Sequence, residues 1–400
     1  MRNERNMLIV RTITDFYPKI TGPANQAFYV SKYLHEYYGW NSIIVTVNNK
    51  ERSVRFQDLG FATVIRLPLI LPKNFSCGYG FVKGYCSFLS QIKPSVVHNH
   101  GYRNFFCDAT FHLRPQLNFK RVVSCHGTVL MYRRIYTNRM SWFPYLFYDA
   151  ITAMQSLKEA DIIIASSEQE KKELDSIGIP HEKIWVIPMG AHIPDLNKYK
   201  KIQAMKCQKE KIIILTVGRW EPSRRLEIIV SAFQKVCNTY KNVELWIVGP
   251  EASRSTFTKK GYLTFIKQLV EKLGISRNIK FLGELTGEGL QKIYAKADIF
   301  VYASLYENFG QTILEAGSFG LPIISTPVGI APEIVINNKT GFLYNFDDYQ
   351  TLAEKINLLV NNDSLRMHYS KNVVKLVREK FSWDKIIPKY KELYESLGKK

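Results

Sequence analysis

The sequence lacks the features that mark membrane-spanning, zinc-binding or secreted disulfide-rich chains. No apolar run among its 400 residues reaches the roughly 20 residues that a bilayer-spanning helix needs. Its six cysteines form no Cys-x-x-Cys pair and no Cys/His spacing typical of zinc sites. The first seven residues are largely polar and lead straight into a short apolar strand, which leaves no secretory h-region. These absences favour a reduced, cytoplasmic protein.

Acidic residues are scarce relative to basic ones. The chain has 55 Lys and Arg against 35 Asp and Glu, a formal net charge of +20. The excess is concentrated in residues 1–148, where 19 basic and 6 acidic residues give +13. A basic half attracts an anionic partner, so nucleic acid, an anionic membrane and a phosphorylated substrate are all candidates.

The length and the pattern of apolar segments indicate an α/β fold with two domains. Four hundred residues exceed one domain of ordinary size. Short apolar runs alternate with helix-like segments, which is typical of a parallel sheet. The predicted strands of the first half lie at 7–14, 42–47, 62–67, 96–98 and 121–124.

The most informative stretch runs from Lys296 to Thr326. An apolar run of strand length at 298–303 is followed by a loop, a helix-like segment after Gly310, and a second apolar run at 323–326. This pattern predicts a strand–helix–strand crossover of a parallel sheet. Two carboxylates lie on it eight residues apart, Glu307 on the loop and Glu315 in the helix.

The start of this predicted helix forms a candidate anion site. The backbone N–H groups of Phe309, Gly310 and Gln311 lack intrahelical partners and can face an anion. A phosphate flanked by two carboxylates that accept hydroxyl hydrogen bonds suits a nucleotide sugar. The alternative is that Glu307 is a solvated loop residue and Glu315 a helix-surface residue.

This stretch resembles the signature of retaining GT-B glycosyltransferases of family 4. The resemblance rests on Glu307-x7-Glu315 with Phe309-Gly310 inside it, followed by Gly320-Leu-Pro322. It implies two Rossmann-like domains that face each other across a cleft, and a nucleotide-diphospho-sugar donor. Within that family pattern, Glu307 would contact hydroxyls of the donor sugar and Glu315 the ribose.

The resemblance covers nearly the whole chain and sets the expected domain boundaries. We expect an acceptor-binding domain at 1–193, a lysine-rich linker at 194–211 and a nucleotide-sugar-binding domain at 212–380. The segment 381–400 would be a helix that crosses back to the first domain.

Four further positions become candidates through the same resemblance. Gly22, after the first strand, would lie against the donor phosphates, with an ordinary structural turn as the alternative. His126, at a predicted strand end, would hydrogen-bond the donor sugar near the reacting carbon; a histidine in the cleft wall is the alternative. Arg219 and Arg224 suit bidentate phosphate recognition.

Two details of the donor site depart from the family pattern or rest on backbone alone. Arg225 stands where the family usually has glycine. The sequence therefore decides neither the backbone conformation of this turn nor which of the two arginines, Arg224 or Arg225, reaches the phosphate. Backbone near Leu285 is the candidate contact for the base. The predicted catalytic residues are His126 and Glu307, and the predicted donor-binding residues are Gly22, Arg219, Arg224, Leu285, Glu307, Phe309, Gly310, Gln311 and Glu315.

Two other motifs have competing interpretations. His98 and His100 could both bind a metal from one strand face, but no carboxylate or third ligand stands nearby, so a strand-end pair lining the cleft is favoured. The segment 130–148 interleaves arginines with aromatic residues. That composition fits a core helix with a solvated face, an interfacial membrane segment, or a surface that stacks single-stranded nucleic acid.

The leading hypothesis is a retaining glycosyltransferase that moves a hexose from a nucleotide-diphospho-sugar to a lipid-linked or glycan acceptor at the cytoplasmic membrane face. Peripheral binding to anionic lipid would follow from the basic first half. We predict no cofactor and no metal, because the Asp-x-Asp motif of the other glycosyltransferase fold is absent. The alternatives are a GT-B hydrolase or epimerase of nucleotide sugars and a nucleic-acid-binding protein, although no nucleic-acid fold signature is present.

Overall fold

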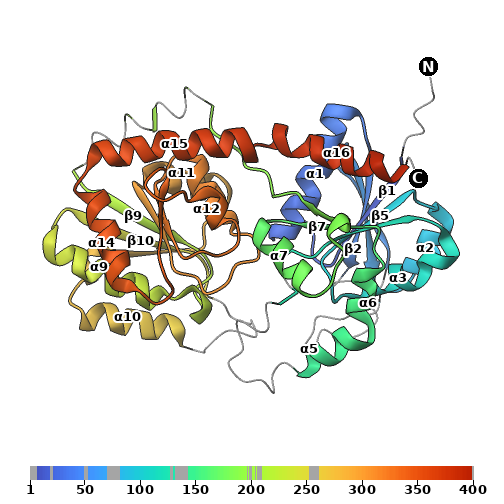
Figure 1. Cartoon of the computed structure of the whole chain (residues 1–400), viewed down its shortest axis with the longest axis horizontal. Coiled ribbons are helices and arrows are strands. Elements are labelled where there is room, and N and C mark those ends of the chain that lie inside the picture. The colour runs from blue at the N-terminus through green and yellow to red at the C-terminus, as the bar shows by residue number, and fades with distance from the viewer. Residues whose placement is uncertain are drawn as a thin grey trace. The chain divides into compact units, whose positions relative to one another are not determined.

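The protein consists of two compact units, and the chain passes through the first of them twice. The computed structural model describes residues 7–18, 21–48, 53–69, 82–126, 129–130, 143–195, 197, 201–202, 204, 210–251 and 261–398. The first unit comprises Met1–Gly190 and Trp383–Lys400, and the second comprises Ala191–Ser382 (Figure 1). Most of the predicted linker, 194–211, lies outside the described residues.

The first unit is built on an eight-stranded sheet in the order β3-β4-β2-β1-β5-β6-β7-β8. Its strands are β1 Ile9–Ile13, β2 Ser42–Asn48, β3 Arg55–Asp58, β4 Ala62–Pro68, β5 Val96–His100, β6 Lys120–Ser124, β7 Ile162–Ala165 and β8 Ile184–Val186. All neighbouring strands are parallel except β3 and β4. The strands predicted in this half all form. The sequence analysis missed β3, because only one of its four exposed residues, Phe56, is apolar.

Helices cover both faces of this sheet, and the last helix of the chain is one of them. The helices are α1 Gly22–Tyr38, α2 Tyr85–Ile92, α3 Phe105–Leu117, α5 Phe143–Tyr148, α6 Met154–Lys158, α7 Glu168–Ser176 and α16 Trp383–Gly398, with a π-helical turn η2 at Asp149–Ala153 and a 3₁₀ turn η3 at His181–Lys183. The blue α1 and the red α16 lie side by side (Figure 1). The ring centroid of Trp383 lies 5.5 Å from the ring centroids of both Tyr29 and Tyr33. The predicted return of the C-terminal helix to the first unit is therefore confirmed.

The two faces of the first sheet differ in polarity. Val10 of β1 and Val97 of β5 are paired in register and pack in an apolar cluster with residues of α2 and α3. Side chains alternate along a strand, so the next register pair, Arg11 and His98, points to the opposite face. That face is covered by α1 and α16 and has a buried polar centre.

The second unit is an open, fully parallel sheet in the order β11-β10-β9-β12-β13-β14. The strands are β9 Ile212–Val217, β10 Val243–Val248, β11 Ile279–Gly283, β12 Ile299–Tyr302, β13 Ile323–Ser325 and β14 Gly341–Leu343. The helices are α9 Leu226–Thr239, α10 Tyr262–Lys272, α11 Gly287–Lys296, α12 Gln311–Ser318, α13 Ala331–Ile334, α14 Tyr349–Val360 and α15 Asp363–Phe381, with 3₁₀ turns η4 at Pro222–Arg224 and η5 at Ser276–Asn278. The predicted crossover at 296–326 forms as β12-α12-β13.

The strand order of the second sheet indicates where a ligand would bind. The chain builds outward from β9 through β10 and β11, and then returns to place β12 on the other side of β9. Ligands of such sheets bind at the carboxyl ends of the strands where the order reverses. Gly249 keeps this edge tightly packed, because a Cβ atom there would lie 1.9 Å from the carbonyl oxygen of Gly218.

Candidate functional site

The second unit brings its predicted residues together at the point where the strand order reverses. Arg219 and Arg224 follow β9, and Glu307 follows the adjacent β12. Ser304 joins the two loops, because its buried hydroxyl lies 3.2 Å from the carbonyl of Ser223 and 2.7 Å from that of Tyr306. The backbone N–H of Leu305 also donates to the Ser223 carbonyl at 2.9 Å.

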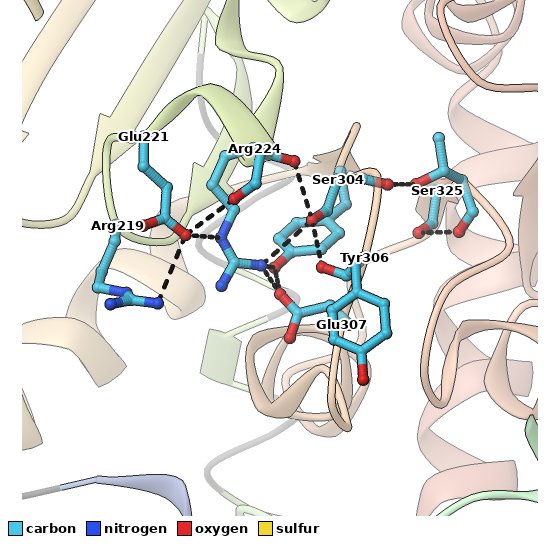
Figure 2. A network of polar contacts seen from close by, with 10 residues as sticks. Arg219, Glu221, Arg224, Ser304, Tyr306, Glu307 and Ser325 are labelled. Atoms are coloured by element: carbon cyan, nitrogen blue, oxygen red, sulfur yellow. Dashed lines mark hydrogen bonds and ion pairs between the residues drawn. The ribbon is translucent and has the colours of Figure 1, made fainter. Parts of the chain in front are cut away.

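Arg224 lies at the centre of this cluster and is directly paired with Glu307. Its Nη1 atom forms an ion pair with Glu307 Oε1 and donates hydrogen bonds to the hydroxyls of Tyr302 and Ser304 (Figure 2). The Tyr302 hydroxyl also bonds Glu307 Oε1. Both charged side chains are mostly buried, with 16% and 11% of their surfaces exposed. Sequence reasoning predicted both residues, but not that one would neutralise the other.

A carboxylate that the sequence analysis did not select holds the arginines in place. Glu221 is 2% exposed, and its Oε1 accepts hydrogen bonds from the Ser223 hydroxyl at 2.8 Å and from Arg219 Nη2 at 3.4 Å. The same oxygen lies 3.7 Å from Arg224 Nε. Figure 2 shows this carboxylate between the two guanidinium groups. In the sequence, Glu221 lies two residues after Arg219 and three residues before Arg224. This proximity to both arginines is the signal that could have identified it.

The structure answers which of the two neighbouring arginines faces the cluster. Arg225 adopts the left-handed conformation, with φ 51° and ψ 45°, at the position where the family usually has glycine. Its side chain turns away to form ion pairs with Glu227 and Asp347. Arg224 is therefore the residue directed toward Glu307, and the turn keeps the backbone conformation that glycine would adopt without strain.

The second signature carboxylate has neutral partners. Glu315 Oε2 accepts a hydrogen bond from the Tyr294 hydroxyl at 3.0 Å, and Oε1 accepts one from Gln311 Nε2 at 3.2 Å. Burial raises the pKa of Glu315 above its ordinary value, against the lowering effect of these two hydrogen bonds. The two signature glutamates thus differ: Glu307 is paired with a cation, whereas Glu315 is surrounded by neutral donors.

The helix predicted to begin after Gly310 forms as α12, which starts at Gln311. Gly310 precedes the helix with φ 92°, a conformation that favours glycine. Phe309 is buried, and its carbonyl accepts a hydrogen bond from the N–H of Ile330 at 2.7 Å. A Cβ atom at Gly329 would lie 2.3 Å from that carbonyl oxygen, so the loop is closely packed against the helix start.

Leu285 lies apart from this cluster within the same unit. It follows β11, the edge strand that β10 separates from β9, and its side chain is half-buried near the start of α11. The structure therefore places it at the same sheet edge but two strands away from the arginines. Its predicted contact with the base stays a prediction.

In the first unit, His126 lies just beyond a strand end as the sequence indicates, whereas Gly22 lies at the start of a helix. Gly22 begins α1 after the Thr21 cap, and a Cβ atom there would contact nothing within 4 Å. His126 follows β6 with φ 54°, a conformation uncommon for residues other than glycine. Its Nε2 atom lies 3.2 Å from Nδ1 of His100, and burial lowers the pKa of His126 to about 4.

The prediction that His98 and His100 are a strand-end pair lining a cleft is wrong for His98. β5 extends two residues beyond its predicted end, which puts His98 inside the sheet with no exposed surface and leaves His100 only 3% exposed. His98 bonds Arg11, Ser124 and Tyr394 instead of a ligand. The described residues contain no cluster of three or more His, Cys, Asp or Glu that could hold a metal ion.

The remaining candidate segment is described only in part. Of the basic and aromatic stretch 130–148, residues 131–142 lie outside the described residues, whereas α5 at its end is described. None of the helices in the described part of the chain combines the length and the apolar character needed to cross a membrane.

Comparison with solved structures defines the class of fold. The chain is similar to sucrose-phosphate synthase from Thermosynechococcus elongatus, with a TM-score of 0.79 at 22% identity over 98% of this chain and 99% of that one. It is also similar to Anabaena Alr3699/HepE in complex with UDP and glucose, with a TM-score of 0.72 at 16% identity over 98% and 100% of the two chains. The two doubly wound units are those of a GT-B glycosyltransferase, which confirms the predicted fold class.

Comparison with protein families and sequences gives the family. The model of Glycosyltransferase Family 4 matches residues 20–193, and the model of Glycosyl transferases group 1 matches residues 197–376. Similar proteins include the uncharacterized glycosyltransferase MJ1607 of Methanocaldococcus jannaschii, 28% identical over 326 residues and 78% of each chain. The phosphatidylinositol N-acetylglucosaminyltransferase GPI3 subunit of Saccharomyces cerevisiae is 22% identical over 396 residues, 96% of this chain and 81% of that one. The chain belongs to the glycosyl transferases group 1 family and is a glycosyltransferase.

Proposed function

We propose that this glycosyltransferase moves a hexose from a UDP-sugar to a lipid-linked acceptor, with retention of the anomeric configuration and without a divalent metal. The observation that carries the donor half of the proposal is the meeting of Arg219, Arg224 and Glu307 where the strand order of the second sheet reverses. The structurally similar Anabaena protein in complex with UDP and glucose supports the choice of nucleotide.

In this proposal the ion pair between Arg224 and Glu307 exchanges partners when the donor binds. Arg224 turns its guanidinium to the diphosphate, together with Arg219 and the N–H groups at the start of α12. The Glu307 carboxylate is then released to accept hydrogen bonds from the sugar hydroxyls. Glu221, which contacts both arginines, keeps them in place during the exchange.

The remaining candidate residues complete the proposed donor site. Glu315 accepts the ribose hydroxyls, backbone at Leu285 contacts the base, and Gly22 allows close approach of the first unit's backbone to the diphosphate. His126 hydrogen-bonds the donor sugar near the reacting carbon. The leaving diphosphate gains negative charge in the transition state, so the arginines and the helix start stabilise it most at that point.

A donor panel tests the reaction. The purified protein is incubated with UDP- and GDP-hexoses, with and without a polyprenyl-phosphate-linked acceptor, and the released nucleotide is measured by mass spectrometry. We expect UDP release that depends on acceptor, an α-anomeric product from an α-linked donor by NMR, and a rate unchanged by EDTA. Equal release without acceptor would indicate a hydrolase, and loss of the rate in EDTA with recovery in Mn²⁺ would contradict the charge arrangement.

The acceptor half of the proposal rests on an exposed apolar stripe of the first unit. Phe143, Leu146, Phe147 and Ile151 lie at helical spacing on α5 and η2, and between 42% and 68% of each residue is exposed. The rings of Phe143 and Phe147 stack with centroids 6.2 Å apart. Exposed aromatic and aliphatic side chains on one helix face suit insertion into the interfacial layer of a membrane.

This stripe is firmly attached to the loops at the carboxyl edge of the first sheet. Asp149, the first residue of η2, accepts two hydrogen bonds from Arg103, at 2.8 Å from Nε and 2.6 Å from Nη2. Arg103 in turn donates to the carbonyl of Val129 at 3.1 Å, three residues after His126. Docking of the stripe on a bilayer would therefore hold the His126 edge near the membrane, where a lipid-linked acceptor is found.

Anionic lipid is the partner that the charge of this half selects. Residues 1–148 carry a net charge of +13, and the segment just before the stripe contains Arg133, Arg134 and Arg139. Each basic side chain near an anionic leaflet contributes on the order of 1 kcal/mol. A few such contacts together with inserted aromatic rings give reversible binding.

Vesicle co-sedimentation tests this docking. We expect binding to vesicles of phosphatidylglycerol and phosphatidylcholine, weaker binding at high salt, and little binding to phosphatidylcholine alone. Exchanging Phe147 and Ile151 for serine should lower binding, whereas Phe265→Ser, a matched change at an exposed ring of the second unit, should not. Equal recovery with neutral and anionic vesicles would refute the docking and leave the donor site untouched.

A further inference from the structure

Three histidines form a row along the polar face of the first sheet. His98 and His100 on β5 stack with ring centroids 4.2 Å apart, and His100 stacks on His126 at 5.4 Å. The row ends in the hydrogen bond between His100 Nδ1 and His126 Nε2 at 3.2 Å. His98, at the inner end, is fully buried. A change in the protonation of the inner rings is therefore transmitted to His126 by direct contact.

The partners of His98 fix its proton. Arg11 Nη1 lies 2.9 Å from His98 Nδ1, and a guanidinium can only donate, so Nδ1 carries no proton. The Tyr394 hydroxyl, which accepts from the same Arg11 nitrogen at 2.6 Å, lies 2.7 Å from Nδ1 and can donate to it. The ring proton is thus on Nε2, which donates to the Ser124 hydroxyl at 2.8 Å. His98 is a neutral imidazole in a single tautomer.

Arg11 is an unusual residue to find at this place. It has no exposed surface, and its partners are the neutral groups Ser31, His98 and Tyr394. Among the described residues no carboxylate pairs with it. A buried guanidinium without a counter-charge disfavours any second positive charge nearby. Such an arrangement at the inner end of the histidine row is costly to stability, and a functional role would explain it.

Among the described residues, the charged and hydrogen-bonding side chains that contact the row are neutral or positive. They are Arg11 from β1, Ser124 from β6, and Tyr390 and Tyr394 from α16, in addition to the three rings themselves. Burial, followed by Arg11, lowers the pKa of His98 well below its ordinary value, and burial together with the neighbouring rings and Arg11 does the same for His100. Neither inner ring therefore accepts a second proton at neutral pH.

We propose that Arg11 and Tyr394 are positioning residues that hold the row His98–His100–His126 neutral and in one tautomer, so that His126 meets the donor sugar as an uncharged imidazole. This rests on the proposed role of His126. Glycosyl transfer develops positive charge at the anomeric carbon, so an imidazolium beside it would oppose the reaction. The C-terminal helix thereby contributes to catalysis through Tyr394, 383 residues away from Arg11 in the chain.

Nitrogen NMR of histidine-labelled protein tests the state of the row directly. In the wild-type protein we expect His98 as the Nε2–H tautomer and no protonation of the row between pH 8 and pH 5.5. In Arg11→Met, a buried cation is replaced by an apolar side chain of similar length, and at least one ring of the row should become protonated in that range. An Nδ1–H tautomer of His98 in the wild type, or an Arg11→Met spectrum that titrates like the wild type, would overturn the proposal.

Kinetics then links the row to the reaction. Burial remains in Arg11→Met, so removing the cation should raise the pKa values of the row only toward 6.5. Lowering the pH from 8 to 5.5 should then reduce kcat of Arg11→Met, by at most about tenfold, the limit at which a pKa of 6.5 leaves about a tenth of the molecules neutral. Tyr394→Phe should show a smaller change of the same kind, and it provides the test if Arg11→Met does not fold. Tyr390→Phe is the matched control, because that hydroxyl on the same helix bonds Gln26 and not the row.

The outcomes separate this inference from the proposed function. An acid limb in Arg11→Met that is absent from the wild type and from Tyr390→Phe supports the inference. Protonation seen by NMR without any acid limb in kcat would overturn the catalytic link of the row and, with it, the role of His126. It would leave the donor site of the second unit in place, since that site is tested by the donor panel.

Discussion

The polar clusters of the two units are built on opposite electrostatic principles. In the first unit one buried cation, Arg11, is surrounded by neutral rings and hydroxyls. In the second unit each arginine of the cluster contacts a carboxylate, with Glu221 between Arg219 and Arg224 and Glu307 on the far side. An arginine that is paired with a carboxylate can exchange that carboxylate for an incoming anion. A buried cation without a carboxylate partner instead disfavours positive charge on its neighbours and so keeps them neutral.

The same contrast appears in how the clusters are assembled. The second cluster comes from two loops that follow adjacent strands of one sheet, and its charged residues lie between 219 and 307. The first cluster joins β1, β5, β6 and α16, so that its members span residues 11 to 394. The following changes test the difference between the paired and the unpaired cluster.

The largest expected effect is that of Arg224→Met. This change removes the guanidinium proposed to meet the diphosphate and leaves Glu307 without its ion-pair partner. Loss of one preorganised group that stabilises transition-state charge costs about a hundred- to a thousandfold in kcat. Steady-state kinetics with the preferred donor measures the loss. A rate within a few-fold of the wild type would remove Arg224 from the donor site.

Exchanging the signature carboxylates for amides should have the next largest effect. Glu307→Gln and Glu315→Gln each remove a charged acceptor without changing side-chain shape. A hydrogen bond to a charged group contributes roughly 1.5–3 kcal/mol, so each variant should lose about ten- to a hundredfold in activity. Thermal unfolding shows whether both variants still fold. Near-normal activity in both would contradict the assignment.

His126→Ala tests the first unit with a smaller effect. Because His126 is proposed to act at the reacting carbon, kcat should fall about fivefold, as expected for the loss of one neutral hydrogen bond of about 1 kcal/mol. The donor KM should change much less. An effect confined to KM would make His126 a residue of the site wall.

Lowering the pH should destabilise the first unit before it destabilises the second. The lowered pKa values of His98, His100 and His126 mean that the unfolded chain binds protons below about pH 6.5 that the folded first unit does not. Its free energy of unfolding should therefore fall by up to about 1.4 kcal/mol per pH unit and per histidine, as the pH drops from about 6.5 toward 4.

The second unit should lose stability only at lower pH. Burial acts to raise the pKa of Glu244, but hydrogen bonds from Lys211 and Lys280 lower it to about 2. The stability that this carboxylate contributes is present above about pH 4.5 and is lost as the pH falls further toward 2. Hydrogen-exchange protection factors, which are corrected for the slower intrinsic exchange in acid, should thus be lower at pH 5 than at pH 7 in α1 and α16, with little change in α9. Simultaneous loss of protection in both units would contradict the comparison.

The smallest expected effect is that of Arg225→Gly. Glycine removes the free-energy cost of a left-handed arginine, about 1 kcal/mol. It also raises the conformational entropy of the unfolded chain, which destabilises the folded state by a similar amount. The lost pair with Asp347, which is 54% exposed, contributes little. Stability should stay within about 1 kcal/mol and activity should be unchanged. A loss of activity comparable to that of Arg224→Met would mean that Arg225 also serves the donor.

The sequence by itself determined the fold class and the sheet edge at which the candidate donor-site residues lie, because both depend on local patterns. Apolar runs of strand length alternating with helical spacing specify a parallel sheet, and residues just after such runs must lie at its carboxyl edge. For that reason Arg219, Arg224 and Glu307 could be selected without a structure. The exposed strand β3 lacked an apolar run and was missed.

Only the tertiary structure decided which polar side chains meet. The choice between Arg224 and Arg225 depended on one left-handed residue, and the role of Glu221 depended on the packing of its loop between two arginines. The row of histidines, with Arg11 and Tyr394 at its inner end, joins segments from both ends of the chain. Strand register, the length of β5 and the return of α16 set those contacts, and long-range pairing of this kind leaves no local pattern in a single sequence.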